Sequence, residues 1–213
     1  LFSTSDKWHS RRKIITPTFH FNILQGYRGV FVTQGRILVE QLEPHADTDR
    51  EVDVFPFIKR CALDIIAETA MDTQLNTQTG ESAEYCEGVV TISKRIFEKM
   101  LMPFLWIQPI WYGIWYGFQF DRLVKQSQDF TLQIIRDRRR QMEDEGLLGE
   151  KDAKTEHVAS KKSVFIDMLL RQQAANHFTD EDIREEVDTF MFEGHDTTGS
   201  AMGFTIWFLG QYP

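Results

Sequence analysis

One stretch of the chain reads Phe190-Met191-Phe192-Glu193-Gly194-His195-Asp196-Thr197-Thr198-Gly199. It places two carboxylates, an imidazole and two hydroxyls in a segment whose remaining pattern is that of a long, mostly apolar helix. A core helix avoids such groups, because an unpaired buried polar group costs about 1–3 kcal/mol and a buried charge costs more. The spacing i, i+3 and i+4 predicts that Glu193, Asp196 and Thr197 share one helix face. We expect that face to be either a functional site or a polar patch closed by neighbouring helices.

Small and hydroxyl-bearing residues in this stretch predict a local opening of the helix. Gly194 and Gly199 each cost about 1 kcal/mol relative to alanine in a helix interior. Thr197 can turn its hydroxyl back to a carbonyl one turn earlier, as can Thr198, which loosens a helix. Gly194 also leaves room for a flat ligand or a diatomic molecule beside the backbone. A carboxylate and a hydroxyl next to such a gap can relay protons, so we expect a proton relay through Asp196 and Thr197.

A metal site is the competing chemical interpretation, because a His195-Asp196 pair is found in metal-dependent hydrolases. Adjacent residues of a helix point about 100° apart. No second histidine lies four residues away on either side. A shared ion is therefore disfavoured, and a metal-dependent hydrolase remains only an alternative.

The rest of the chain is helical in pattern nearly throughout. Thr179 and Asp182 have the spacing of a capping box and predict where the last helix begins. Residues 143–162 are charged and aperiodic, as expected of a solvated connection. No segment alternates as a strand does, so the predicted fold class is mainly α. The other expected helices are at 5–16, 22–43, 56–71, 83–100, 120–142 and 164–171.

Composition narrows the classes of function. The net charge of −8 argues against nucleic acid as the main partner. Cys61 and Cys86 have no metal-ligand spacing and are expected to be buried free thiols, which suits a reducing compartment. The 213 residues begin without methionine and stop inside a helical pattern, so we expect a fragment of a longer protein.

Residues 103–120 form an uncharged stretch rich in aromatic residues. Pro103, Pro109 and Gly113 argue against an uninterrupted membrane-spanning helix. Tryptophan and tyrosine favour a membrane–water interface, so the stretch can dip into a membrane surface. The alternative is a loop that folds over the core or lines an apolar pocket.

A basic motif near the start pairs an indole with a guanidinium. Trp8 and Arg12 lie four residues apart and share a helix face, where Arg12 offers a fork suited to carboxylates. Basic residues surround them in an otherwise acidic chain. Taken alone, this pattern most often marks a solvated face.

Together these motifs resemble a known family. Residues 8–21, WHSRRKIITPTFHF, look like the C-helix signature of the cytochrome P-450 superfamily. Residues 186–198, EVDTFMFEGHDTT, look like the I-helix signature of its family 4 branch, and residues 61–71 resemble its E helix. The resemblance implies one partial domain over residues 1–213, which runs from helix C to helix I of that fold. It would lack the N-terminal anchor and the C-terminal haem-cysteine region.

The resemblance also implies roles for particular residues. Trp8 and Arg12 would bind a propionate of haem b. Gly194 would line the oxygen-binding gap, and Asp196 and Thr197 would deliver protons for cleavage of the O–O bond. Glu193 matches a position at which family 4 enzymes form an ester to a haem methyl group. The iron ligand should be a cysteine outside this chain, since neither cysteine present has the required context.

The implied protein is a haem-thiolate monooxygenase that hydroxylates fatty acids, terpenoids or xenobiotics with O2 and NADPH-derived electrons. NADPH-cytochrome P-450 reductase and cytochrome b5 are its expected partners, on the cytosolic face of the endoplasmic reticulum membrane. Arg11 and Lys13 would lie on the surface where an acidic reductase docks. The fragment itself should be inactive. A non-enzymatic helical protein that binds lipid through residues 103–120 is the other alternative.

Overall fold

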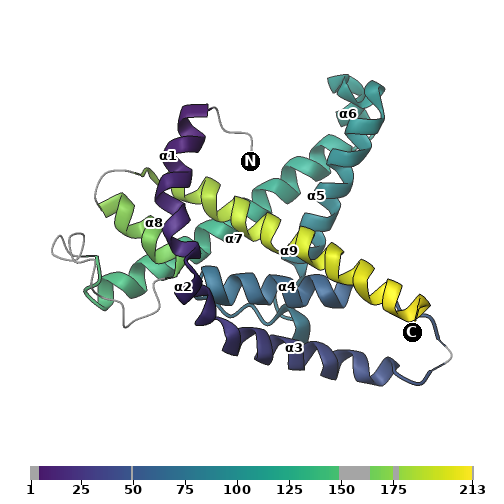
Figure 1. Ribbon diagram of the computed structural model, residues 1–213. Coiled ribbons are helices and arrows are strands. Elements are labelled where there is room, and N and C mark those ends of the chain that lie inside the picture. The colour runs from purple at the N-terminus through teal and green to yellow at the C-terminus, as the bar shows by residue number, and fades with distance from the viewer. Residues whose placement is uncertain (1–4, 49, 149–163, 175–177, 213) are drawn as a thin grey trace.

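The computed structural model describes residues 5–48, 50–148, 164–174 and 178–212 (Figure 1). These residues form helices and connecting loops, and no β-strand occurs among them, so the mainly α fold class is confirmed. The α-helices are α1 (Ser5–Ile15), α2 (Phe21–Gln25), α3 (Arg28–Leu42), α4 (Phe55–Ala70), α5 (Ala83–Leu101), α6 (Gln108–Gly113), α7 (Tyr116–Asp144), α8 (Phe165–Ala174) and α9 (Asp180–Gln211). Short 3-10 helices are η1 (Thr16–Phe19), η2 (Glu43–His45), η3 (Thr77–Thr79) and η4 (Pro103–Trp106).

Most predicted helices are confirmed to within a few residues, but the helix expected at 22–43 is wrong. It is two helices, α2 and α3, separated at Gly26 and Tyr27. Gly26 closes a tight turn in which its N–H donates to the carbonyl oxygen of Ile23 at 3.0 Å. A glycine inside a helix favours such an interruption. The solvated connection predicted at 143–162 lies mostly outside the described residues.

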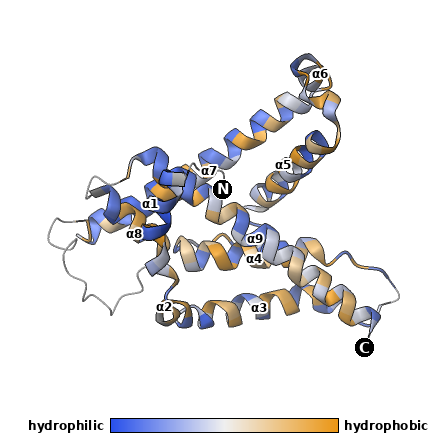
Figure 2. Ribbon diagram, turned by 45° about the horizontal axis from the view of Figure 1, so that its top comes forward, coloured by the Kyte–Doolittle hydropathy of each residue, from blue (hydrophilic) through white to orange (hydrophobic). Residues whose placement is uncertain are grey.

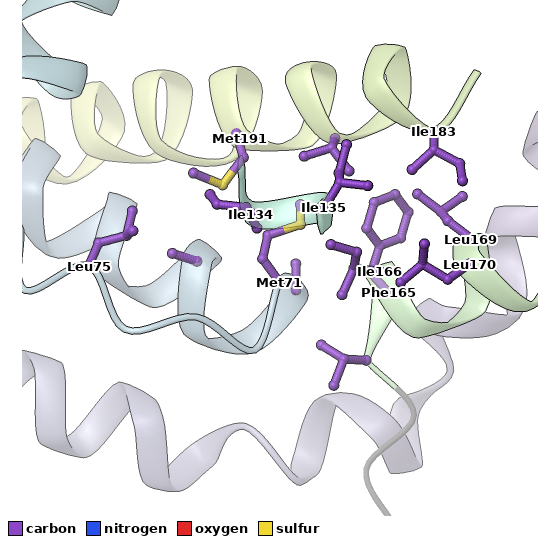
Figure 3. Close-up of a cluster of buried hydrophobic side chains, with 14 of the residues drawn as sticks. Met71, Leu75, Ile134, Ile135, Phe165, Ile166, Leu169, Leu170, Ile183 and Met191 are labelled. Carbon is purple, nitrogen blue, oxygen red and sulfur yellow. The ribbon is translucent and has the colours of Figure 1, made fainter. Parts of the chain in front are cut away.

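Helix α9 crosses the centre of the molecule with α4 beside it, and α3 packs on α4 (Figure 1). Helix α9 starts at the predicted capping box. The Thr179 hydroxyl accepts a hydrogen bond from the Asp182 N–H, and the Asp182 carboxylate accepts one from the Thr179 N–H. Beside its first half, apolar side chains of α4, α7, α8 and α9 form the core (Figure 3). Fully buried members are Leu63, Met71, Met142, Ile166, Leu169, Ile183 and Met191.

Helices α5 and α7 form an antiparallel arm that carries α6 at its tip, away from this core (Figure 1). The aromatic stretch is thus divided among η4, α6 and the start of α7, and Trp115 at the last break has a positive φ of 66°. Several of its apolar residues are exposed. The tip that carries them lies at the far end of the arm in the ribbon coloured by hydropathy (Figure 2). Trp106 and Trp111 line a cavity of about 480 Å³ below it. The stretch therefore does not fold over the core. Among the described residues, no helix is both long and apolar enough to cross a membrane.

Candidate functional site

The polar stretch of α9 is continuous α-helix, so the predicted opening is wrong. The hydrogen bond expected of Thr197 is confirmed, because its hydroxyl donates to the carbonyl oxygen of Glu193, one turn earlier, at 2.9 Å. The two glycines expected to weaken the helix instead face α4. A β-carbon at Gly194 would lie 2.7 Å from Ile66 Cγ1, and one at Gly199 would lie 3.0 Å from Lys59 Cγ.

Gly203 continues this seam one turn further, where a β-carbon would lie 2.7 Å from the ring of Phe55. The two helices run antiparallel and approach closely through these three glycines, which explains why the glycines occur in a helix. On its other flank Gly194 borders an apolar cavity of about 550 Å³ between α3, α4 and α9. A gap for dioxygen beside Gly194 stays a prediction.

Glu193, Asp196 and Thr197 lie on one broad face of the continuous helix, as their i, i+3, i+4 spacing predicts, but their surroundings differ. Asp196 turns to α4, where its carboxylate accepts from Lys59 Nζ at 2.8 Å. Thr197 is exposed at the opposite edge of this face. Glu193 lies between, and its Oε1 is buried without a hydrogen-bond partner among the described residues. The acid and the hydroxyl predicted to move protons are thus held by different partners.

His195 is fully buried among the core side chains, with its ring 6.4 Å from that of Tyr85. Its Nδ1 lies 2.6 Å from the carbonyl oxygen of Met191 and donates to it, which leaves Nε2 as a buried acceptor without a partner in the described residues. Burial lowers the pKa of His195 below its usual value, so the ring is neutral. Because Asp196 faces Lys59, the two residues do not converge on a shared ion.

In α1, the neighbouring cations Arg11 and Arg12 differ, because Arg11 is buried and Arg12 is exposed. Trp8 and Arg12 are both exposed, and the Arg12 guanidinium lies over the indole, 5.0 Å from the ring centroid. Neither side chain makes a hydrogen bond or ion pair with the described residues. Arg11 is buried and contacts three carboxylates of α9, Asp182, Glu185 and Glu186. The expectation that Arg11 lies on an open docking surface is therefore wrong, while Lys13 is exposed as expected.

Two contacts of the candidate site and its surroundings were not predicted from the sequence. Lys59 lies in an apolar helix and gives no sign of its partner, since Asp196 is 137 residues away. The partner of Arg11 had a signal, because Asp182, Glu185 and Glu186 place three carboxylates on one face of the predicted helix. The hydrogen bond from Lys7 lowers the pKa of Glu185 most, and Arg11 lowers it further against the opposing effect of burial.

Both cysteines are buried free thiols, as predicted. Burial, with a smaller contribution from the Asp64 charge, raises the pKa of Cys61 to about 11. Burial raises the pKa of Cys86 as well. Metal ligation requires the thiolate form, so both environments oppose it.

With this geometry in hand, comparison with known proteins decides the family. The chain matches the family model described as Cytochrome P450 over residues 1–213. The chain belongs to the cytochrome P450 family. Among relatives of this P450 chain, Cytochrome P450 4V2 of Pongo abelii is 40% identical over 219 residues, with 100% of the chain and 41% of that protein covered. Cytochrome P450 4d2 of Drosophila melanogaster is 39% identical over 224 residues, with 100% and 43% covered. Cytochrome P450 4c21 of Blattella germanica is 37% identical over 220 residues, with 100% and 42% covered.

This P450 chain is therefore similar to family 4 members, as its motifs predicted, and it spans about two fifths of the length of these relatives. The family implies a haem cofactor. The residues present fit a haem. Among the described residues, Arg12 has no carboxylate partner and lies beside an exposed aromatic ring, and Glu193 Oε1 is buried without a hydrogen-bond partner.

Proposed function

We propose that residues 1–213 are one partial domain of a haem-thiolate monooxygenase that hydroxylates apolar substrates. Fatty acids, terpenoids and xenobiotics are the proposed substrate classes, with O2 as oxidant and NADPH as electron source. One observation carries the proposal: the Arg12 guanidinium has no carboxylate partner in the described chain, whereas its neighbour Arg11 has three. A guanidinium beside an indole suits a flat group that carries its own carboxylates.

Trp8 and Arg12 would hold a propionate of haem b, and Glu193 would contact the same haem. Bound haem supplies the oxidising chemistry, with a cysteine thiolate from outside this chain on its iron. The protein's contribution is to orient the substrate, exclude water and move protons. The fragment alone is expected to be inactive.

Asp196 and Thr197 are the proposed proton-handling residues. The Thr197 hydroxyl donates to the Glu193 carbonyl, so its oxygen lone pairs stay available to accept a hydrogen bond from a water molecule. The Asp196 carboxylate is held by Lys59 at 2.8 Å. Protons that pass through Asp196 must therefore do so beside a lysine ammonium group.

The decisive experiment uses the full-length protein. Its reduced carbon monoxide complex should show the red-shifted Soret band of thiolate ligation. Absence of bound haem, or of that band in correctly folded protein, would refute the monooxygenase assignment. It would favour the non-enzymatic lipid-binding alternative, which the exposed apolar tip of the α5–α7 arm supports.

A covalent ester between Glu193 and a haem methyl group is a finer proposal, supported by Oε1, which is buried without a hydrogen-bond partner in the part of the chain that the structure describes. Glu193 would hold the haem through an ester of its carboxylate, and O2 consumed in turnover would be the two-electron oxidant that this bond requires. Haem should then resist organic extraction under denaturing acid, and Glu193→Ala should make it extractable. Ready extraction from the unaltered, turned-over protein contradicts the ester.

The tip of the arm supports contact with a membrane surface, which we place at the cytosolic face of the endoplasmic reticulum. Phe104, Trp106, Ile107 and Trp115 are exposed there. Backbone hydrogen exchange over residues 103–118 should slow when phosphatidylcholine vesicles are added, while exchange over α3 should not. Equal exchange with and without vesicles would argue against this contact. NADPH-cytochrome P-450 reductase and cytochrome b5 are the proposed redox partners, for which Lys13 offers an exposed cation.

A further inference from the structure

A cluster of charged side chains joins α1 to the start of α9. The side chain of Arg11, 10% exposed, contacts Asp182, Glu185 at 2.7 Å and Glu186 at 2.8 Å. Lys7, one turn earlier on α1, contacts Glu185 at 2.8 Å. Glu186 is itself nearly buried, with 12% of its side chain exposed. Three carboxylates thus converge on one guanidinium that has little access to water.

The geometry of the Arg11 guanidinium suits a contact with several carboxylates. A guanidinium presents several N–H donors in a fixed plane and can serve several carboxylates at once, which a lysine ammonium group does less well. Arg12 and Lys13, the next two cations of α1, are exposed and make no ion pair with the described residues. Of these three consecutive cations, Arg11 is therefore the one that contacts α9.

The cluster is in register with the candidate site. Glu186 precedes Glu193 by seven residues and Thr197 by eleven, which places the three within about 40° on one face of α9. The distance along the helix axis from Glu186 to Glu193 is about 10 Å at 1.5 Å per residue. On α1, Lys7 and Arg11 form one stripe, and Trp8 and Arg12 form the adjacent stripe. The contacts of the first stripe thereby fix the direction in which the second one points.

We propose that Arg11 is a positioning residue, which locks α1 onto Asp182, Glu185 and Glu186 and so holds Trp8 and Arg12 beside the Glu193–Thr197 face. This inference rests on the proposed function, since haem is the group that Trp8 and Arg12 would hold there. Arg11 does not touch that group itself; it acts through Arg12.

The test is the rate at which the full-length, haem-loaded protein gives up haem to apomyoglobin. If the wild-type haem proves covalent, the Glu193→Ala background is used for every variant. Arg11→Gln should speed release by about tenfold or more, because it leaves the nearly buried Glu186 carboxylate without its cation and removes the tie between α1 and Asp182. Lys13→Gln is the matched control, which removes an exposed charge from the same helix and should change the rate less than twofold. Arg11→Lys should fall between wild type and Arg11→Gln, and it replaces Arg11→Gln if that variant does not fold.

A double-mutant cycle with Arg12→Gln separates positioning from general destabilisation. If Arg11 acts through Arg12, the double variant should release haem little faster than the faster single variant. Multiplying effects would overturn the proposal, and so would equal rates for Arg11→Gln and Lys13→Gln. A raised KM for the reductase with unchanged haem release would also overturn it, in favour of a docking role. Failure of the wild-type protein to bind haem would instead refute the proposed function.

Discussion

The contact between Gly194 and Ile66 predicts a measurable coupling between α9 and α4. An alanine β-carbon at position 194 would lie 2.7 Å from Ile66 Cγ1 and 3.0 Å from Cδ1, well inside van der Waals contact. Overpacking of this kind costs about 1–3 kcal/mol. Replacing glycine by alanine in a helix interior returns about 1 kcal/mol. Gly194→Ala should therefore lower the free energy of unfolding by about 0–2 kcal/mol.

The background Ile66→Ala removes both offending atoms and leaves the Ile66 β-carbon at 3.3 Å. There, Gly194→Ala should raise the free energy of unfolding by up to about 1 kcal/mol, because the helix-propensity gain remains and most of the overlap is gone. The difference between the two backgrounds isolates the overlap, at about 1–3 kcal/mol, since helix propensity cancels in the cycle. Urea unfolding of the full-length protein followed by circular dichroism measures each corner.

Gly35→Ala on α3 is the matched control, because a β-carbon there meets nothing within 4 Å. It should give the same effect in both backgrounds. A coupling below about 0.5 kcal/mol between positions 194 and 66 would refute the packing explanation for Gly194. A change in carbon monoxide binding without a change in stability would then favour the oxygen-gap role.

Three further predictions concern Thr197, His195 and the two cysteines. Thr197→Ala should raise peroxide release per NADPH consumed about tenfold or more if the hydroxyl helps deliver protons, and unchanged coupling would contradict that role. Burial lowers the folded-state pKa of His195 below the ordinary 6.5. The unfolded chain therefore binds the proton more readily, and stability due to His195 is lost as pH falls through 6.5 towards the folded-state pKa. Wild type should lose up to about 1.4 kcal/mol per pH unit more than His195→Phe in that window, as urea unfolding at several pH values can show; parallel pH curves would exclude this. Cys61 and Cys86 should react with a thiol reagent only as fast as the folded protein opens, and rapid labelling at neutral pH would show that their described burial is wrong.

Local chemistry made α9 predictable from sequence. Its capping residues, Thr179 and Asp182, are close in the chain, and both the cap and the helix start are confirmed. Helix α4 was likewise marked by its apolar run and by Pro56 in its first turn. These signals depend on neighbours a few residues away, which the sequence displays directly.

Contacts between distant segments could not be predicted in the same way. Residues 76–81 look like an ordinary polar loop, yet Thr77 is fully buried there. The Asp64 carboxylate on α4 accepts hydrogen bonds from the Thr77 N–H and hydroxyl and from the Gln78 N–H. The surroundings of the site residues could not be predicted for the same reason. Helical spacing places Glu193 and Asp196 on one face, but it does not reveal that Lys59, on a helix far away in sequence, contacts Asp196.

The glycine seam between α4 and α9 has a consequence for how members of this family can diversify. Because α9 rests on Phe55, Lys59 and Ile66 through positions that have no side chain, bulk at those three α4 residues sets the roll and depth of α9. Selection for a new substrate can therefore act on α4, behind the site, and tilt Glu193 and Thr197 without replacing either of them. A library of variants that exchanges α4 among relatives should therefore change the position of α9 more effectively than one that randomises the residues of the pocket wall.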